Sequence, residues 1–324
     1  MTSRLPVVSL AVTVGLWASA FPAIRVGLDG LGVAGLSVLR LAAASAALAA
    51  AAPVLGVRRP RRRDLPLIAL CGASGMTAYQ LLLNWGEQRV AAGTASLLIA
   101  VAPVFSVLLA AGFLGERLTR RTLLGSAVAL VGAAVVALAG GPSHFSASAL
   151  VVLAAAAAQG LYHVASKPLL GRYTGLEVAS YAMWAGTALA VPLAPAAGLA
   201  LAHAAAGRPG GLAAAAWPAV YLGVLPSAVG FVTWGYAVAR FRLSTATAAL
   251  YLVPPAALVV SYAWLGEVPS PVAIAGGLVS VVGVVIISRR AARQAPAAPG
   301  QLTPGGKVAA DGRAAGEKAI RNAG

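Results

Sequence analysis

The chain has 324 residues, of which 60% are hydrophobic and 10% charged, and its net charge is +16. Soluble domains carry about 45–50% apolar and about 25% charged residues, so this composition excludes an ordinary globular protein. Most basic residues stand in short gaps between apolar runs, a pattern that argues against a nucleic-acid-binding domain and is typical of a multispanning membrane protein.

Ten apolar segments follow one another along the chain, and a membrane-spanning helix needs about 20 such residues. Their expected bounds are Val7–Leu28, Ala34–Leu55, Leu65–Trp85, Ala92–Leu114, Leu123–Ala139, Ala147–Leu169, Glu177–Leu201, Trp217–Ala239, Thr245–Leu265 and Pro271–Ile287. The runs are continuous, whereas the strands of a membrane barrel would be shorter and would alternate. The sequence therefore predicts an all-α membrane protein with ten transmembrane helices.

The first segment has an alternative interpretation as a signal peptide. Arg4 precedes an apolar run, and residues 18–20 (Ala-Ser-Ala) imitate a small-residue cleavage site. The apolar run continues past that point to Val26, so we favour a span that stays in the protein.

The basic residues predict the orientation of the chain. Ten spans would put both termini and every second link on one side of the membrane, and all but four of the 24 Lys and Arg residues fall on that side. The exceptions are Arg25, Arg40, Arg89 and Arg208. Because Lys and Arg collect on the cytoplasmic side, we expect cytoplasmic N- and C-termini in the cell (inner or plasma) membrane. The last residues, 291–324, lack apolar periodicity and are expected to form a disordered basic cytoplasmic tail.

An internal repeat appears when the sequence is shifted by 151 residues. Pro103 then falls on Pro254, and Leu-Gly-Glu at residues 114–116 falls on Leu-Gly-Glu at residues 265–267. The repeat unit contains five spans, and because five is odd the second copy must be inverted. Inverted repeats are typical of secondary transporters, which hold their substrate near the bilayer midplane.

Two inverted five-helix repeats are therefore expected, at residues 1–142 and 143–290. The motifs that accompany the repeat are Trp17…Phe21…Arg25, Leu39-Arg40, Pro103…Leu114-Gly115-Glu116-Arg117 and Pro254…Leu265-Gly266-Glu267. In this combination the chain resembles the drug/metabolite transporter superfamily, of the EamA type, over about residues 5–290. The resemblance implies export or exchange of small metabolites, amino acids among them.

Polar and aromatic side chains inside the expected spans are the candidates for a substrate cavity, because polar groups in a bilayer are costly. They are Trp17, Phe21, Arg40, Tyr79, Gln80, Asn84, Gln159, His163, Trp234 and Tyr251. A partly aromatic cavity with a few hydrogen-bonding groups is the usual make-up of a small-molecule site. The alternative for each residue is an interhelical hydrogen bond or packing contact, worth about 0.6–2 kcal/mol.

Charged and titratable candidates need separate interpretations. Arg40 either attracts a carboxylate-bearing solute, or it snorkels to the outer interface or pairs with backbone carbonyls. His163 titrates near neutral pH and is the candidate if transport is coupled to protons. No Asp or Glu stands in the middle of a span, with Glu87 and Glu267 near span ends, so a carboxylate proton relay is not expected.

Two prolines and two glutamates are expected to shape the helices. Pro103 and Pro254 interrupt their spans and act either as hinges or as fixed kinks. Glu116 and Glu267 each follow Leu-Gly at the end of a span, and we expect each to bond free N–H groups at the start of the next helix.

The sequence thus predicts a secondary transporter that exports or exchanges a small amino-acid-like or amphipathic metabolite by alternating access. A non-transporting receptor or scaffold is the alternative, but it does not explain two inverted copies. An intramembrane enzyme would need a catalytic motif, and none of the usual His-Glu-x-x-His, paired mid-span Asp or Gly-x-Ser-x-Gly patterns is present. We expect no enzyme activity, cofactor, metal or nucleic-acid partner, only a small solute and the lipid bilayer.

Overall fold

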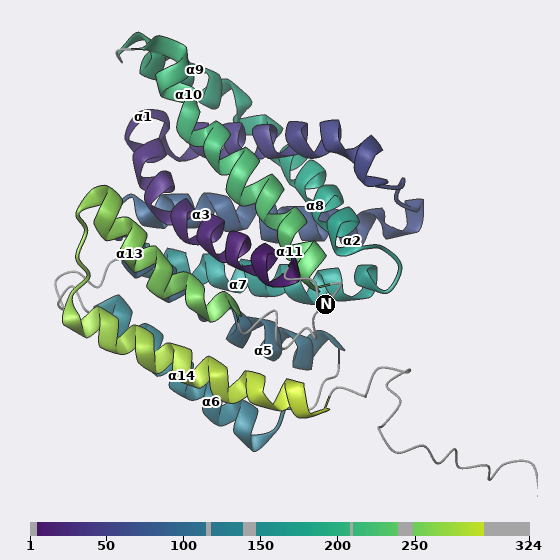
Figure 1. The fold of residues 1–324 in the computed structure, drawn as a ribbon, viewed down its shortest axis with the longest axis vertical. Helices are drawn as coiled ribbons and strands as arrows, with labels where there is room; N and C mark the ends of the chain where they lie inside the picture. The colour runs from purple at the N-terminus through teal and green to yellow at the C-terminus, as the bar shows by residue number, and fades with distance from the viewer. Residues whose placement is uncertain (1–4, 115–117, 139–146, 208–209, 239–248, 295–324) are drawn as a thin grey trace, which may run out of the picture. The chain divides into compact units, whose positions relative to one another are not determined.

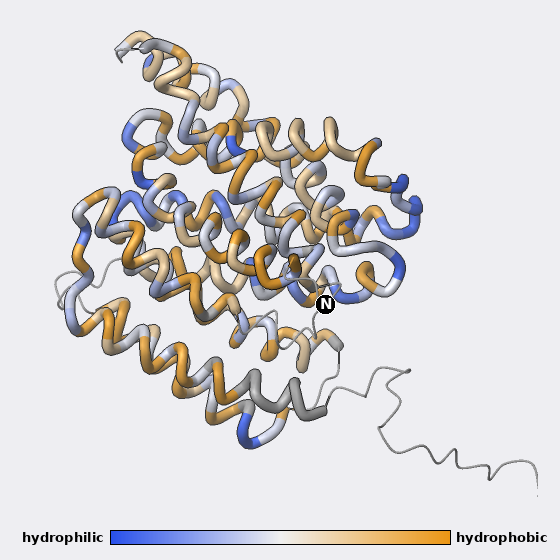
Figure 2. Tube along the Cα trace, in the orientation of Figure 1, coloured by the Kyte–Doolittle hydropathy of each residue, from blue (hydrophilic) through white to orange (hydrophobic). Residues whose placement is uncertain are grey.

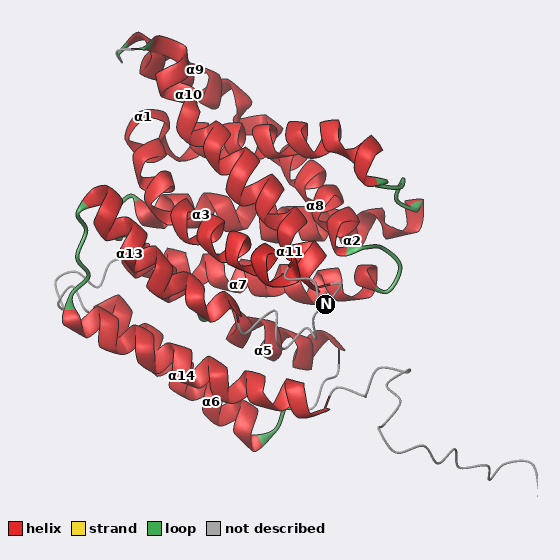
Figure 3. Ribbon diagram, viewed as in Figure 1, coloured by secondary structure: helices red, strands yellow, loops and turns green. Residues whose placement is uncertain are grey.

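The computed structural model describes residues 5–114, 118–138, 147–207, 210–238 and 249–294. Every regular element in these ranges is helical (Figures 1 and 3). The elements are α1 (Leu5–Leu55), η1 (Arg62–Asp64), α2 (Leu65–Cys71), η2 (Gly72–Ala78), α3 (Tyr79–Glu87), α4 (Ala92–Ile99), α5 (Ala102–Leu114), α6 (Arg120–Leu138), α7 (Ala147–Leu170), α8 (Gly175–Ala190), η4 (Val191–Leu193), α9 (Ala194–Ala206), α10 (Gly211–Leu222), η5 (Gly223–Val229), α11 (Gly230–Val238), η6 (Leu250–Leu252), α13 (Val253–Leu265) and α14 (Pro271–Gln294). Residues 1–292 form one compact unit, and the expected tail lies outside the described residues from residue 295 on.

Six helical stretches of the described chain are long and apolar enough to cross a membrane, and three further apolar helices are shorter. The long stretches are Leu5–Leu55, Arg62–Glu87, Ala92–Phe113, Ala147–Leu170, Gly175–Ala206 and Gly211–Trp234. Figure 2 shows hydrophobic residues along the helices and hydrophilic residues at several of their links. Large apolar side chains such as Phe113 and Val259 are exposed on the surface of the bundle, where contact with lipid is favourable and contact with water is not. The protein is therefore a multi-pass membrane protein.

The first two expected segments, Val7–Leu28 and Ala34–Leu55, meet without a loop. Both lie in α1, which has 51 residues and bends at Gly32, where φ is +60° and ψ is −175°. Glycine tolerates this positive φ because it has no Cβ. A single residue therefore replaces the link that the sequence predicts there.

Other expected bounds shift by a few residues. The seventh segment, expected at Glu177–Leu201, runs from Gly175 to Ala206 through α8, η4 and α9. It begins earlier because Thr174 caps α8 in a capping box with Glu177, so the glutamate lies inside the first turn. The eighth begins at Gly211 instead of Trp217, and the start of the ninth at Thr245 lies outside the described residues.

Irregular stretches recur 151 residues apart. The π-helical segments η2 and η5 both begin at a glycine, Gly72 and Gly223, and end at Ala78 and Val229. The helices α5 and α13 likewise occupy ranges offset by 151 residues, as do the starts of α6 and α14. The backbone thus repeats the offset that the sequence motifs predict.

Both predicted hinge prolines lie at the second position of a helix. Pro103 follows a turn at residues 100–101, between α4 and α5, and Pro254 follows η6 at the start of α13. Proline suits the first turn of a helix because its missing N–H would have no intrahelical partner there. The prolines begin helices at these breaks, and their role as hinges stays a prediction.

Helices α6 and α14 approach each other closely through glycine. A methyl group at Gly132 would lie 2.4 Å from the main-chain nitrogen of Ser280, and one at Gly276 would lie 2.8 Å from the carbonyl oxygen of Gly132. The Ser280 hydroxyl donates to the carbonyl oxygen of Ala129 at 3.0 Å. Small residues of this kind let helix backbones pack in a membrane.

Replacing Gly132 by alanine should therefore lower the thermal unfolding temperature of the purified protein. The added methyl group would contact backbone atoms that cannot move aside, and overpacking of this kind costs about 1–3 kcal/mol. Gly15→Ala is the matched control, because nothing lies within 4 Å of the Cβ that it would add. Equal unfolding temperatures for the two variants would contradict the close α6–α14 contact.

Candidate substrate site

Arg40 lies inside the helix bundle, at the contact between α1 and η5. Its side chain is 7% exposed, and its Nε donates to the Ser227 hydroxyl at 3.2 Å. Gly223 makes this contact close, because a Cβ there would lie 2.6 Å from the Arg40 carbonyl oxygen. One terminal guanidinium nitrogen has no hydrogen-bond partner among the described residues. Arg40 thus keeps a donor without a partner among the described residues inside the bundle, and the choice between its predicted roles stays a prediction.

The face of α3 next to Arg40 carries amide groups. The side-chain nitrogen of Asn84 donates to the Ser37 hydroxyl at 2.8 Å, which joins α3 to α1. The side-chain oxygens of Asn84 and Gln80 are buried without a partner in the described chain. The electrostatic field of Arg40 also reaches Tyr79. Asn84 is thus joined to the helix that carries Arg40, and Gln80 lies one turn before it on α3.

His163 lies on α7 beside two other hydrogen-bonding groups. Its Nδ1 lies 2.9 Å from the hydroxyl of Ser106, on α5, and its Nε2 lies 3.4 Å from the Gln159 side-chain nitrogen. Gly160 permits this approach, because a Cβ there would lie 2.9 Å from the Ser106 main-chain nitrogen. His163 is exposed although it lies in the middle of an apolar helix. A solute that reaches α7 can therefore contact its ring.

Trp17 and Trp234 come together from opposite ends of the sequence. Their ring centroids lie 5.7 Å apart, and Phe231 lies at the same distance from Trp17, edge to face. The Trp17 indole nitrogen donates to the carbonyl oxygen of Pro226 at 3.0 Å. This carbonyl belongs to η5, so the bond joins α1 to η5.

Two predicted candidates are not placed in these groups. Phe21 is 5% exposed and packs in the apolar core with Ile24 and Leu28. The side chain of Tyr251 lies outside the described part of the structure. Serine hydroxyls at positions 37, 106 and 227 hydrogen-bond the candidates but were not predicted, because serine in a helix usually bonds its own backbone.

Glu267 binds the start of a helix, but not the helix that the sequence predicts. Its carboxylate accepts from the main-chain nitrogen of Ala92, at the start of α4, at 2.8 Å. It also pairs with Arg25 of α1 at 3.8 Å. Contrary to expectation, Glu267 therefore does not cap the following helix but makes a contact across the bundle. We call this group the Glu267 clasp (Arg25, Ala92 and Glu267). Its repeat partner Glu116 lies outside the described residues.

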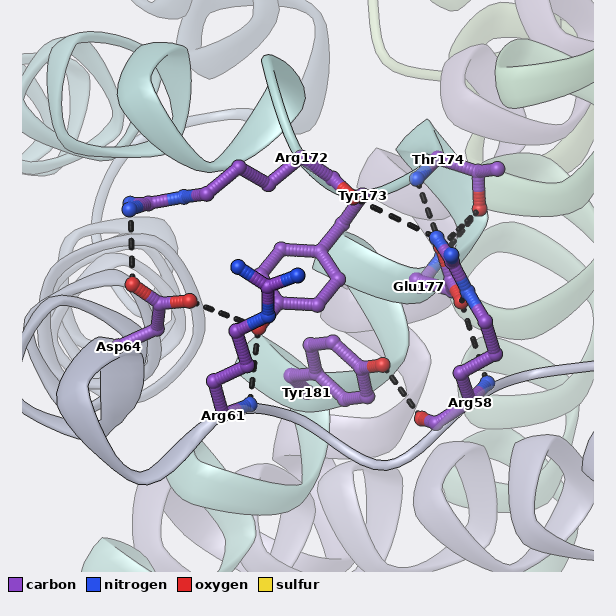
Figure 4. Close-up of polar contacts among 8 residues, drawn as sticks. All are labelled: Arg58, Arg61, Asp64, Arg172, Tyr173, Thr174, Glu177 and Tyr181. Atoms are coloured by element: carbon purple, nitrogen blue, oxygen red, sulfur yellow. Dashed lines mark hydrogen bonds and ion pairs between the residues drawn. The ribbon is translucent and has the colours of Figure 1, made fainter.

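A second polar group joins the link after α1 to the start of α8 (Figure 4). Glu177 accepts from the main-chain nitrogen of Arg58 at 3.1 Å and from its Nε at 2.7 Å. It accepts from the main-chain nitrogen of Thr174 at 2.8 Å, and the Tyr181 hydroxyl donates to the Arg58 carbonyl oxygen. Hydrogen bonding to Glu177 raises the pKa of Arg58.

Tyr173 extends this group toward α2. Its hydroxyl accepts from the main-chain nitrogen of Arg61 at 2.8 Å and donates to Asp64 at 2.7 Å. Arg172 pairs with Asp64 at 3.0 Å, and the Tyr173 and Tyr181 rings pack edge to face at 5.4 Å. We call the eight residues of Figure 4 the tyrosine cluster. The sequence signal for this cluster was that two of the eight acidic residues of the chain, Asp64 and Glu177, stand next to links that carry basic residues.

Residues 5–138 and 146–289 both match the EamA-like transporter family. The chain belongs to the EamA-like transporter family. This confirms the resemblance that the sequence motifs indicate, and the protein is a membrane transporter of a small solute. The two matched ranges follow each other along the chain and cover nearly all of its described helices.

Three proteins from other organisms are similar to this chain over most of its length. A protein of Streptantibioticus cattleyicolor, named "Probable terminal-alkyne amino-acid exporter", is 66% identical over 282 residues, which cover 87% of this chain and 93% of the relative. An uncharacterized transporter of Bacillus subtilis, YdfC, is 36% identical over 86% of this chain and 89% of its own. The pseudopaline exporter CntI of Pseudomonas aeruginosa is 27% identical over 70% of this chain and 76% of its own.

A solved crystal structure has the same fold. It covers 92% of this chain and 100% of its own, with a TM-score of 0.58 and 19% sequence identity. At this identity the likeness concerns the EamA-like fold alone.

Proposed function

We propose that this EamA-like protein exports a small α-amino acid across the cell membrane by alternating access between two inverted five-helix halves. The observation that carries the substrate class is a buried guanidinium with a free donor nitrogen, Arg40, in a chain 66% identical to a protein named as an amino-acid exporter. The halves are residues 1–142 and 143–290, and residues 291–324 form a basic tail.

The contact between α6 and α14 supports the inverted repeat. Gly125 corresponds to Gly276 and Gly132 to Gly283 at the offset of 151 residues. A Cβ at Gly283 would lie 2.6 Å from the Gly125 carbonyl oxygen, just as Gly132 and Gly276 approach each other. When each glycine is replaced by its repeat equivalent, the contact between Gly132 and Gly276 becomes the contact between Gly283 and Gly125. This is the contact pattern of a two-fold axis. This pattern supports a pseudo-two-fold axis between these helices, which would make the halves antiparallel.

The described helices are compatible with the ten spans that we propose. The bend at Gly32 divides α1 into two arms, each long enough to cross the hydrocarbon core. The shorter helices α6, α13 and α14 complete the set, since apolar sequence extends α13 upstream. With ten spans, the tyrosine cluster lies at the inner end and the Glu267 clasp at the outer end. Both termini are then cytoplasmic, as the distribution of Lys and Arg favours.

The amino acid would bind among the groups described above. Arg40 offers its free nitrogen to the α-carboxylate, and guanidinium–carboxylate bonds are charge-assisted. The unpartnered side-chain oxygens of Gln80 and Gln159 accept from the α-ammonium group. Trp17 and Trp234 supply apolar surface for the amino-acid side chain. We propose no catalysed reaction, because the named relatives are transporters and exporters.

Counterflow in reconstituted vesicles tests this function. Vesicles loaded with unlabelled terminal-alkyne α-amino acid should accumulate the labelled compound from outside, because an alternating-access carrier exchanges one molecule for another. The alkane analogue measures the contribution of the alkyne, and the amine that lacks the carboxylate should not exchange. Failure of every amino acid tested to exchange, with the protein folded, would overturn the proposed substrate class.

A further inference from the structure

Glu87 is buried at the end of α3, and its carboxyl group has no hydrogen-bond partner among the residues that the structure describes. The side chain is 0% exposed, and neither carboxyl oxygen accepts or donates a hydrogen bond among the described residues. Glu87 is also the last residue of α3, where the negative end of the helix dipole disfavours an anion. The position near a span end, which the sequence indicates, therefore does not make this carboxyl solvent-exposed.

The charged groups near Glu87 have other partners. The Arg25 guanidinium donates to the main-chain carbonyl of Glu87, and it pairs with the carboxylate of Glu267. Glu267 in turn accepts from Ala92. The Glu267 clasp thus contacts the Glu87 main chain through Arg25, and no hydrogen bond from it to the carboxyl group is found among the described residues. A second carboxylate, Glu267, adds like-charge repulsion.

Elements packed against α3 add one further charge. From α1, the electrostatic field of Arg40 reaches Glu87, but no hydrogen bond joins the two side chains. On α3 itself Tyr79 is the titratable neighbour. From α7, Val152 and the main chain of Ser148 pack at Gly86, and neither carries a charge. The cations therefore act on the Glu87 carboxyl group only from a distance.

An ionised carboxylate buried without a donor costs several kcal/mol, and a bound proton removes that cost. We propose that Glu87 is a proton-binding site that is occupied while the outer end is closed and releases its proton to the outer solution when that end opens. This inference rests on the orientation and alternating access proposed above. The proton would then be a second ligand of the protein, bound at Glu87 and not among the residues proposed to bind the amino acid.

Opening of the outer end would make the surroundings of Glu87 more favourable for the ionised carboxylate. When the Glu267 clasp separates, Arg25 loses Glu267 as its partner and water reaches the carboxyl group. The O–H bond of Glu87 then breaks, the proton passes to water, and the carboxylate that remains is stabilised by Arg25. Because the proton binds the closed form better, external acid must favour that form by linkage. The proton leaves to the outside and returns from it, so no net proton transport follows.

Exchange measured against external pH tests this site with Glu87→Gln, whose amide imitates the protonated carboxyl. The wild-type exchange rate should fall as external pH falls, by up to about tenfold per pH unit for a single proton. The E87Q rate should stay at the wild-type acid value at every pH. Asp29→Asn is the matched control, because Asp29 is an exposed carboxylate on α1, and it should follow the wild-type profile. A wild-type pH profile in E87Q would overturn the proposal.

Infrared spectroscopy of the purified protein gives a second measurement that needs no transport. The spectrum of the wild-type protein at neutral pH minus that of E87Q should contain the carbonyl band of a protonated carboxyl group, and the corresponding difference for D29N should lack it. Absence of the band from the first difference would overturn the proposal even if exchange is normal. If the wild-type protein exchanges no amino acid, the proposed function fails while the infrared result still decides the state of Glu87.

Discussion

Replacing Arg40 by leucine should lower the affinity of amino-acid exchange by a factor of about ten to a hundred while the protein stays folded. The guanidinium nitrogen that has no partner among the described residues would bind the substrate carboxylate, and leucine has no donor. Hydrogen bonds to charged groups contribute about 1.5–3 kcal/mol, which corresponds to roughly a tenfold to hundredfold loss of affinity. Counterflow of the labelled amino acid at several concentrations measures this loss.

The stability of the Arg40→Leu variant separates a binding role from a structural role. A buried charge with incomplete partners is costly, and apolar replacements at such positions are often neutral or stabilising. The thermal unfolding temperature of the variant should therefore be equal to that of the wild type or higher. Arg40→Lys keeps the charge but loses the planar donor set, so we expect intermediate exchange.

Arg89→Leu is the matched control for the removed charge. Arg89 is exposed and lies over the Trp85 ring at 5.8 Å, and no contact between Arg89 and Arg40 is found in the described part of the chain. Its exchange rate should equal that of the wild type. Normal exchange in the Arg40→Leu variant, or an equal loss in both variants, would show that Arg40 does not bind the substrate.

Replacing Glu177 by alanine should destabilise the protein more than any other single change in the tyrosine cluster. Glu177 accepts hydrogen bonds from Arg58 and Thr174 and completes the capping box of α8. Loss of a helix cap alone costs about 1 kcal/mol, and each kcal/mol lowers the unfolding temperature by about 2–4 °C in a chain of 150–250 residues. We expect a decrease of several degrees in a thermal unfolding measurement in detergent.

Two controls make this result specific. Arg59→Ala removes a neighbouring exposed charge for which no contact with Glu177 is found, and it should unfold at the wild-type temperature. Glu177→Gln keeps one acceptor oxygen for the cap but loses the charge that binds Arg58, so its unfolding temperature should lie between the other two. If Glu177→Ala unfolds like Arg59→Ala, the cluster does not hold the link after α1 to α8.

Much of the fold was predictable from the sequence because it depends on local chemistry. Continuous apolar runs predict helices, since a backbone in lipid must satisfy its own N–H and C=O groups. The offset of 151 residues between Pro103 and Pro254 recurs as an offset between π-helical segments and helix starts. Glycine at position 32 is compatible with a sharp bend, but only the structure shows that this residue alone joins two arms of α1.

The candidate site was predictable only as a set of residue types. Arg40, Gln159 and His163 are unusual inside apolar segments, so composition alone identifies them. Their partners were not predictable, because Ser106 and Ser227 look like ordinary helix serines until α5 and η5 are packed against α7 and α1. Whether these groups bind an amino acid is decided by the exchange measurements.

The sequence by itself determined that the chain is helical, apolar and internally repeated, because each property depends on residue type and spacing. Only the tertiary structure decided how the acidic residues are used. Glu267 looked like a cap for the helix that follows it, yet it binds Ala92 at the start of a helix in the other half. Glu87 looked like a residue at an exposed span end, yet it is fully buried, and its carboxyl group has no hydrogen-bond partner in the described part of the structure. Burial and pairing depend on which distant helices meet, and that is a property of the packed bundle and not of any one segment.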